Sequence, residues 1–414
     1  MKIELITTGT ELLTGEVLNT HVSAIGERLE SVGLQLERQT SVPDGGAVEQ
    51  AMEEACRRAD VVLVTGGLGP TPDDVTREAA ARICGSVLVL DPSILEQLEA
   101  YFQGRGMQMV AANRRQAYVP NHAKVLPNDR GTAPGLYFPG DANNCHLILL
   151  PGPPREMLPM FDGQIMPLLV RLGGEAPNGR GQQTLRVMGL GESEVVESLG
   201  RDFETRHGVK LAYCIGEGDI CLRISGLHDK VSAAAADVIE RMATHLVSDR
   251  GHTIAEVVVR QLRQRKQTVA LAESCTGGGL GARLTAVPGS SDVFRYGWVT
   301  YANEAKQAEL HVPAALLEQH GAVSRQVADA MATGAITKAG ADWALAITGI
   351  AGPDGGSDEK PVGTIHIALA GRNLTEPRTI HRVFRGDRDR VRMLSEQNAL
   401  DLLRRALLED RSAE

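Results

Sequence analysis

The strongest arrangement for covalent chemistry in the sequence is centred on Ser274, in the segment ESCTGGG at residues 273–279. An apolar run at residues 268–272 predicts a strand before it, and a helix is expected from Thr276 onward. The serine would then lie at a turn above the sheet edge. The glycines after it would leave backbone N–H groups unobstructed at a helix N-terminus, where they can hold an anion or a developing oxyanion. A serine at such a position can also be no more than a helix N-cap.

A second segment could supply the base that a serine nucleophile needs. Residues 300–306, TYANEAK, begin within a strand predicted at residues 299–301 and continue into a helix. Tyr301 and Lys306 are five positions apart across this bend, so both could face one pocket. A lysine acts as a base when burial lowers its pKa from about 10.4 towards about 7–8, and Tyr301 could relay the proton or orient the amine. Taken alone, Lys306 would more often be a surface residue of a helix.

A third loop, TGIAGP at residues 348–353, follows a buried strand predicted at residues 343–347. Its glycines would let the backbone approach a phosphate or an amide closely. Cys275, next to Ser274, is a competing nucleophile. We rank it lower, because no histidine accompanies it in this stretch and small buried thiols are common.

Three further strand-end loops, in the N-terminal part of the chain, suit the binding of phosphate. Strands are predicted at residues 3–7, 60–65 and 146–150, and each runs into a loop rich in glycine, proline or threonine. The carboxyl ends of parallel strands meet at one edge of a sheet, so a shared pocket is expected there. The residues that could contact a ligand in it are Gly9, Thr10, Gly66, Gly67, Gly69, Gly131, Thr132 and Gly152.

Carboxylates lie beside these loops. Glu11, Asp73 and Asp74 could hold a hard divalent cation that bridges a diphosphate. For Asp73 and Asp74 the alternative is an ordinary pair of carboxylates at a helix N-terminus, which the helix macrodipole favours. The residues alone leave both interpretations open.

The elements that must position these residues follow an α/β pattern, with short β-rich runs alternating with helical ones. We predict two three-layer αβα domains with mainly parallel sheets, at residues 1–170 and 251–414, joined by a small α+β domain of β-α-β-β-α order at residues 182–250. A linker rich in turn-forming residues is expected at residues 171–181. No catalytic arrangement is found in the middle domain, so a spacer or dimerisation role is expected for it.

Composition limits the function classes. The net charge of −9 disfavours nucleic-acid binding through a broad basic face. The six cysteines form no CxxC pair, so neither a zinc site nor a secreted disulfide framework is suggested. The N-terminus has no signal-peptide pattern, and no stretch approaches the ~20 apolar residues of a membrane span. A cytoplasmic protein with no membrane partner is expected.

The C-terminal motifs resemble the CinA C-terminal domain. They are ESCTGG (273–278), PGSS (288–291), TYANEAK (300–306), GAVS (321–324) and AITGIAGP (346–353). That family hydrolyses the carboxamide of nicotinamide mononucleotide to nicotinate mononucleotide and ammonia. The resemblance implies Ser274 as nucleophile, Lys306 as base and Tyr301 as an assisting hydroxyl, with no cofactor. The substrate contacts that it implies are Cys275, Thr276, Gly277, Gly278, Asn303, Thr348 and Gly349.

The N-terminal motifs are similar to the molybdopterin-binding-like domain of the same family. They are TTGTELLTG (7–15), TGGLGPTPDD (65–74), GTAPG (131–135) and LPGPPREM (150–157). The resemblance implies metal-dependent hydrolysis of ADP-ribose to AMP and ribose 5-phosphate, and a homodimer. The alternatives are a pterin- or nucleotide-binding regulatory module without turnover, and an accessory factor in competence or DNA damage. Gly279, Tyr296 and His21 depart from the residues expected at their positions, a larger apolar residue, a glycine and a smaller polar residue.

Overall fold

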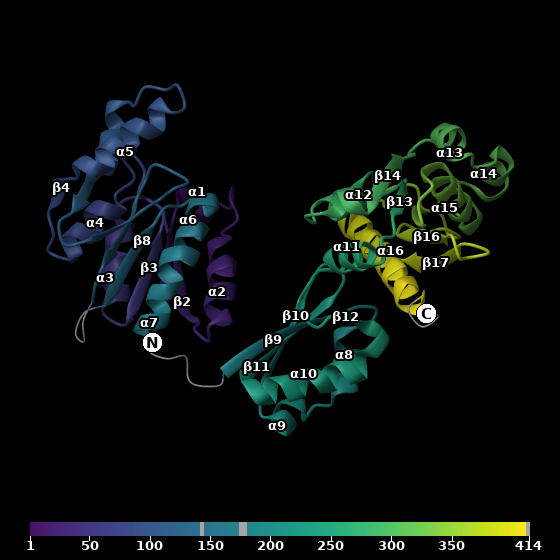
Figure 1. Cartoon of the computed structure of the whole chain (residues 1–414), viewed down its shortest axis with the longest axis horizontal. Helices are drawn as coiled ribbons and strands as arrows, with labels where there is room; N and C mark the ends of the chain where they lie inside the picture. The colour runs from purple at the N-terminus through teal and green to yellow at the C-terminus, as the bar shows by residue number, and fades with distance from the viewer. Residues whose placement is uncertain (141–144, 174–179, 411–414) are drawn as a thin grey trace. The chain divides into compact units, whose positions relative to one another are not determined.

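The computed structural model describes residues 1–140, 145–173 and 180–410 (Figure 1). The chain divides into two units, Met1–Gln182 and Gln183–Glu414. Of the linker predicted at 171–181, residues 174–179 lie outside the described residues. Before them, helix α7 (Met166–Leu172) ends one residue earlier, at Leu172, and after them strand β9 (Arg180–Val187) begins.

The first unit is built on a six-stranded sheet with the order β2-β1-β3-β8-β7-β6. The first four strands in this order are parallel to one another, β7 is antiparallel to β8, and β6 is antiparallel to β7. The strands are β1 (Ile3–Thr8), β2 (Leu36–Val42), β3 (Val61–Thr65), β6 (Lys124–Leu126), β7 (Gly135–Phe138) and β8 (His146–Leu150). A separate two-stranded ribbon is formed by β4 (Leu88–Leu90) and β5 (Tyr118–Pro120).

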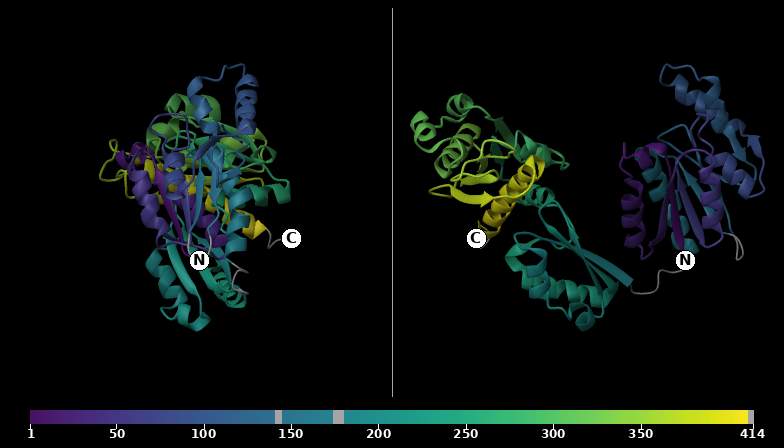
Figure 2. Two further views of the ribbon diagram at one scale, coloured as in Figure 1. Left: turned by 90° about the vertical axis from the view of Figure 1, so that its left-hand side faces the viewer. Right: turned by 180° about the vertical axis from the view of Figure 1, so that it is seen from behind.

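Helices cover both faces of this sheet (Figures 1 and 2). One face packs against α2 (His21–Ser31), α6 (Pro154–Met160) and α7, and the other against α3 (Ala47–Cys56), α4 (Thr76–Ile83) and α5 (Pro92–Gln103). Successive residues of a strand point to opposite faces. Along β3, accordingly, Val61 and Leu63 enter one core and Val62 and Val64 the other. Strands buried on both faces, such as β3, are therefore apolar throughout, which makes them recognisable from sequence.

The second unit begins with a four-stranded sheet of order β10-β11-β9-β12. The remaining strands are β10 (Lys210–Ile215), β11 (Ile220–Leu227) and β12 (Leu246–Ser248), and the helices are α8 (Glu192–Leu199), α9 (Phe203–His207) and α10 (His228–Met242). Helix α10, the last element of the predicted β-α-β-β-α order, ends at Met242 and is followed by a further strand, β12. Leu246 pairs with Val187 of β9 and so belongs to the sheet.

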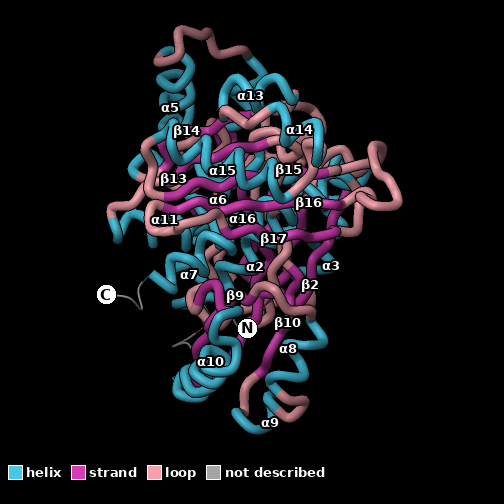
Figure 3. The backbone as a smooth tube through the Cα atoms, turned by 90° about the vertical axis from the view of Figure 1, so that its right-hand side faces the viewer, coloured by secondary structure: helices cyan, strands magenta, loops and turns pink. Residues whose placement is uncertain are grey.

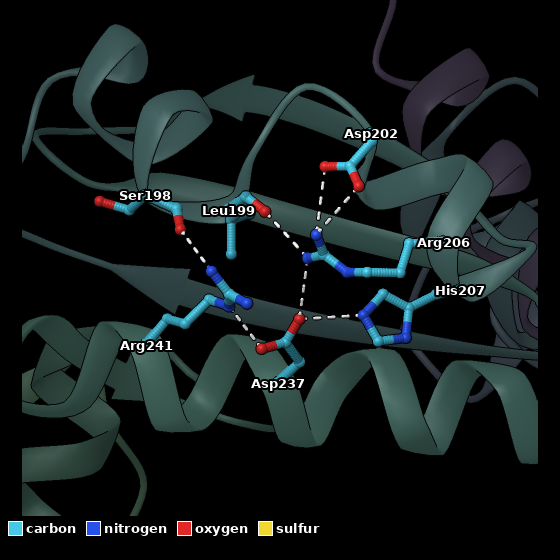
Figure 4. Close-up of polar contacts among 7 residues, drawn as sticks. All are labelled: Ser198, Leu199, Asp202, Arg206, His207, Asp237 and Arg241. Carbon is cyan, nitrogen blue, oxygen red and sulfur yellow. Dashed lines mark hydrogen bonds and ion pairs between the residues drawn. The ribbon is translucent and has the colours of Figure 1, made fainter.

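A cluster of charged side chains links helices α8, α9 and α10 through hydrogen bonds (Figure 4). The Asp237 carboxylate on α10 accepts hydrogen bonds from Arg241, Arg206 and His207. Arg241 and Arg206 also donate to the carbonyls of Ser198 and Leu199, at the end of α8. Partial burial alone would raise the pKa of Asp237, but the three hydrogen bonds outweigh it and lower the pKa to about 2.

The C-terminal part has a five-stranded sheet of order β14-β13-β15-β16-β17. The first three strands are parallel, and β16 and β17 are antiparallel to their neighbours. The strands are β13 (Val269–Glu273), β14 (Phe294–Val299), β15 (Trp343–Gly349), β16 (Thr364–Gly371) and β17 (Arg378–Val383). With helices on both faces (Figure 3), the predicted fold class is confirmed.

The two faces of this sheet differ in side-chain size. Val269 and Leu271 of β13 pack towards α11 (Ile254–Arg265), α12 (Gly279–Thr285) and α16 (Arg388–Asp410). Ala270 and Ala272 face the other side, where the helices are α13 (Asn303–Leu310), α14 (Ala314–His320) and α15 (Arg325–Ala339). Alanines at the sheet surface let α15 pack closely over the strands.

The strand predicted at residues 299–301 is misplaced. β14 ends at Val299, and Thr300 and Tyr301 lie in the loop beyond it. The carbonyls of these two loop residues bind the Lys306 amine rather than a neighbouring strand. In the described parts of the chain, no helix combines the length and the apolar character that crossing a bilayer would require.

Candidate active site and a second pocket

Ser274 and Lys306 are in direct contact. Ser274 follows the last residue of β13, and Lys306 lies one turn into α13. The Lys306 Nζ is 3.1 Å from the Ser274 Oγ. Ser274 is 8% exposed and Lys306 is 1% exposed, so the contact is shielded from water. The loop between β14 and α13 thus places a lysine on a serine that is 32 positions earlier in the chain.

Two main-chain carbonyls fix the direction of the lysine amine. Lys306 Nζ donates to the carbonyl of Thr300 at 2.8 Å and to that of Tyr301 at 3.2 Å. A neutral amine has two N–H bonds and one lone pair, so these two acceptors leave the lone pair directed at Ser274. Burial lowers the pKa of Lys306, which favours this neutral form. No carboxylate pairs with Lys306 anywhere in the described chain.

The helix N-terminus after Ser274 is not free, contrary to the expectation from sequence. The buried Glu273 carboxylate accepts hydrogen bonds from the N–H groups of Gly278, Leu280 and Gly281, at 2.9–3.1 Å. The N–H groups of Gly277 and Gly279 donate to carbonyls within the same turn. Among the described residues, the N–H groups of Cys275 and Thr276 make no hydrogen bond. These two are therefore the donors left for a ligand.

Tyr301 contributes its main chain to the lysine, while its side chain points outward. The ring is 60% exposed, and its hydroxyl accepts a hydrogen bond from Arg388 at 3.0 Å. Arg388, the first residue of α16, also donates to the carbonyl of Gly352 in the third loop. The role of the Tyr301 hydroxyl in proton transfer stays a prediction. Sequence reasoning missed Arg388, since nothing in the start of the last helix marks it as part of this region.

The other predicted residues of this site differ in their accessibility. Cys275 is buried, which raises the pKa of its thiol to about 12 and makes it a poor nucleophile. Thr276 is fully buried and its hydroxyl has no partner in the described chain. Thr348 donates its hydroxyl to the carbonyl of Ala322. Gly349 is confined by strand β16, whereas Asn303 is exposed at the start of α13.

The glycines after Ser274 have a conformational reason. Gly277 and Gly278 have φ of 60° and 96°, values that residues with a side chain rarely adopt. At Gly279, where a larger residue was expected, a Cβ would lie 2.0 Å from the Glu396 carboxylate, so a side chain there would require Glu396 to move. Tyr296, also unexpected, lies on the exposed edge strand and stacks on Trp298.

The N-terminal loops form a pocket of about 320 Å³ at the carboxyl ends of β1, β3 and β8. The predicted residues that line it are Gly9, Glu11, Gly66, Gly67, Gly69, Asp73, Asp74, Thr132 and Gly152. Thr10 and Gly131 were also predicted but do not line the pocket. The Thr10 N–H donates to the Asp44 carboxylate, and Gly131 lies next to the Glu156 carboxylate. The structure thus brings together the three strand-end loops and the 131–135 motif that the sequence analysis singled out.

The lining residues that were not predicted include Asp44, Gln116 and Glu156. Asp44 follows β2 and accepts hydrogen bonds from the hydroxyl of Thr8 and the N–H of Thr10, so it orders the first loop. Its position after a strand was the available signal. Gln116 is 1% exposed and its Oε1 has no partner within the described residues, which sequence could not reveal.

The charge of this pocket bears on the expected metal. Its lining has five carboxylates and no lysine, arginine or histidine among the described residues. No three metal-binding side chains of the described chain converge closely enough to hold an ion by themselves. The donors fit a cation that takes its other ligands from phosphate and water, as Mg²⁺ commonly does. Glu11, Asp73 and Asp74 share one pocket, and the metal itself stays a prediction.

His21 makes a hydrogen bond to the end of β3, the strand that leads into this pocket. It is buried, and its Nδ1 is 2.8 Å from the hydroxyl of Thr65, the residue before Gly66. Burial lowers its pKa, so the ring is neutral near pH 7. The unexpected histidine is therefore a buried hydrogen-bonding group beneath the loop.

The chain matches two protein-family models along its length. Residues 4–171 match the Probable molybdopterin binding domain and residues 251–407 match the CinA C-terminal domain. A CinA-like protein of Geobacter metallireducens is 46% identical, over 99% of this chain and 100% of the relative. One of Akkermansia muciniphila is 43% identical, over 97% and 96%. The crystal structure of a competence/damage inducible protein from Agrobacterium tumefaciens is 42% identical, covers 37% of this chain and 93% of its own, and superposes with a TM-score of 0.36.

Proposed function

Because the chain belongs to the CinA family over its whole length, we propose that its C-terminal domain hydrolyses the carboxamide of nicotinamide mononucleotide. The products are nicotinate mononucleotide and ammonia. The observation that carries the proposal is the buried 3.1 Å contact between Lys306 Nζ and Ser274 Oγ. A buried lysine without a carboxylate partner costs stability, which a purely structural role would not explain.

In the first half-reaction the Ser274 Oγ attacks the carboxamide carbon, and its proton passes to the neutral Lys306 amine. The carbonyl oxygen becomes an oxyanion, for which the N–H groups of Cys275 and Thr276 are the unpaired donors. Lys306 then gives its proton to the leaving nitrogen, and the C–N bond breaks. Ammonia departs and an ester joins the acyl group to Ser274.

In the second half-reaction water attacks this ester and Lys306 accepts a proton from the water. The bond between the acyl carbon and Ser274 Oγ breaks, and the proton returns to the serine. The remaining proton of the water is released from the new carboxylic acid to solvent, and the carboxylate product leaves. Arg388 lies on the outer side of the same region, and its guanidinium suits the phosphate of a mononucleotide.

Ammonia release from nicotinamide mononucleotide tests this proposal. The wild-type chain should release ammonia, and Ser274→Ala and Lys306→Ala should lose the activity while remaining folded by circular dichroism. Full turnover by both variants would show that another group is the nucleophile. No ammonia from the wild type would favour a binding module or an accessory role in competence or DNA damage.

A second activity is favoured by the N-terminal pocket, which we propose hydrolyses ADP-ribose to AMP and ribose 5-phosphate. A pocket lined by five carboxylates would repel a diphosphate unless a cation lies between them. Glu11, Asp73 and Asp74 are the proposed ligands of a divalent metal ion, which would polarise the phosphoryl oxygen and activate water. The glycine loops would let main-chain N–H groups approach the phosphates.

AMP formation from ADP-ribose, with and without a divalent cation, tests the second activity. Asp73→Ala and Asp74→Ala should lower it. Activity unchanged by a chelator would remove the metal from the proposal. Binding of ADP-ribose without AMP formation would indicate a regulatory pocket. A homodimer remains a prediction from the family resemblance and is tested by light scattering of the intact chain.

A further inference from the structure

We infer that Glu273 is a positioning residue that aligns Ser274 and the two oxyanion donors by anchoring the turn between β13 and α12. This inference rests on the proposed role of Ser274 as nucleophile. Glu273 immediately precedes Ser274 and is 2% exposed. It touches neither the Ser274 hydroxyl nor the Lys306 amine, so it would act only through the main chain.

The carboxylate binds its own turn at three points. Oε2 accepts from the N–H groups of Gly278 at 3.0 Å and Leu280 at 3.1 Å, and Oε1 accepts from Gly281 at 2.9 Å. The side chain therefore spans from the residue before the nucleophile to the first turn of α12. No cation pairs with this carboxylate in the described part of the chain. The main-chain donors and the helix dipole stabilise its charge instead.

The backbone around Ser274 is held from the sheet as well. The Glu273 carbonyl accepts from the N–H of Thr300, and the Ser274 N–H donates to the carbonyl of Ile347. The sheet thus fixes one end of the turn and the Glu273 carboxylate fixes the other. Between them lie Cys275 and Thr276, whose N–H groups are the ones left unpaired.

Two other helices of this domain, α11 and α15, are capped without involving the site. Helix α11 has a capping box in which Thr253 and Glu256 bind each other's backbone N–H groups. Helix α15 is capped by the hydroxyl of Ser324. Only at α12 is the capping carboxylate covalently adjacent to the proposed nucleophile, so that loss of the cap must change the turn that carries Ser274.

The experiment measures phosphonylation of Ser274 by a fluorophosphonate probe in the full-length protein. Ser274 Oγ attacks phosphorus, the P–F bond breaks, fluoride leaves and Lys306 takes the serine proton. The probe needs an aligned nucleophile and oxyanion donors but no nicotinamide. In Glu273→Gln one oxygen becomes an N–H₂ group that faces an N–H donor, and the labelling rate should fall about 100-fold, as expected for displacement of a nucleophile by about 1 Å. Glu256→Gln is the matched control, since it removes a helix-capping carboxylate of the same domain and should label at the wild-type rate.

Each outcome decides a different point. Absence of Ser274 labelling in the wild type would overturn the proposed nucleophile, and with it this inference. Equal labelling of wild type and Glu273→Gln, with both folded well below their melting temperatures, would overturn the positioning role alone. Should Glu273→Gln not fold, hydrogen exchange in the wild type decides. The N–H groups of Gly278, Leu280 and Gly281 should be protected, and exchange as fast as in a frayed helix end would contradict the anchor.

Discussion

The two candidate sites lie at the same place in similar sheets, yet they are assembled to different degrees. In the C-terminal domain the proposed nucleophile, the proposed base and the carbonyls that orient its amine are already in contact. In the N-terminal pocket five carboxylates line a space of about 320 Å³ without converging on one point. One arrangement could react as it stands, whereas the other needs a cation and a ligand to complete it.

This difference follows from the chemistry proposed for each site. A serine becomes nucleophilic only if the protein itself supplies a base at hydrogen-bond distance. A divalent cation on a diphosphate takes much of its coordination from phosphate oxygens and water, so the protein need provide only one or two carboxylates. Assembly in the absence of ligand is therefore expected for the first site and not for the second.

The largest effect should come from the reacting pair. Ser274→Ala and Lys306→Met should each lower ammonia release by about 1,000-fold or more, and the double variant should be no slower than either, because the two groups act as one unit. Steady-state rates of all three proteins check this, with AMP formation from ADP-ribose as the control that should not change. Multiplicative losses in the double variant would contradict a shared function.

The second-largest effect should come from chelation, which should affect the activity of only one of the two sites. Removing divalent cations should abolish AMP formation and leave ammonia release unchanged. Asp74→Ala should lower AMP formation by about 10–100-fold, the usual range for loss of a group near a metal. The Asp74 carboxylate also binds the N–H and hydroxyl of Thr71, so Thr71→Val is the control for loop order alone. An equal loss in both variants would assign Asp74 to loop structure rather than to the metal.

The rate of ammonia release should depend on pH, by about tenfold per pH unit below the pKa of Lys306. Burial lowers the pKa of Lys306 below its usual 10.5. Ammonia release should rise with pH up to that lowered value, since the base must be neutral, and then level off. Between the lowered value and 10.5 the unfolded chain binds more protons, so stability should rise with pH relative to Lys306→Met. Rates and melting temperatures across this range check both signs, and a falling limb would contradict a lysine base.

The smallest effect should be confined to stability. Asp237→Asn removes the charge shared by Arg206, His207 and Arg241, and should lower the free energy of unfolding by about 1–2 kcal/mol without changing either activity. Because the pKa of Asp237 is lowered to about 2, its contribution should be present above pH 3.8 and lost as the pH falls towards 2. Urea unfolding measures this. Asp202→Asn, which removes an exposed partner of Arg206, should change stability by less than about 0.5 kcal/mol.

The interior of the fold was predictable because buried parallel strands are apolar throughout. Several of the strands missed or misplaced from sequence are edge strands. Both β2 (LERQTSV) and β17 (RTIHRV) carry polar residues on an exposed side, and the start of β14 was misjudged for the same reason. Missing β2 also hid Asp44, which follows it. An edge strand is defined by its one neighbour, which local sequence does not reveal.

Ser274 and Lys306 could be predicted from the sequence, whereas the residues that hold or surround them could not. Ser274 and Lys306 each stand where a strand ends, a position that patterns of apolar residues can identify. The role of Glu273 depends on how far its side chain folds back over the turn. Arg388 reaches the region from the last helix, and the amide oxygen of Gln116 stands out only because it is buried without a partner among the described residues. Such features arise from tertiary packing.

The carbonyls that hold Lys306 belong to the main chain of Thr300 and Tyr301. Replacing either side chain leaves its carbonyl in place, so mutation at these two positions cannot delete the acceptors that aim the amine. Over evolutionary time the identities of residues 300 and 301 are thus free to drift as far as orientation of the base is concerned. Selection on this part of the mechanism should act on the path of the backbone, through the length of the loop between β14 and α13.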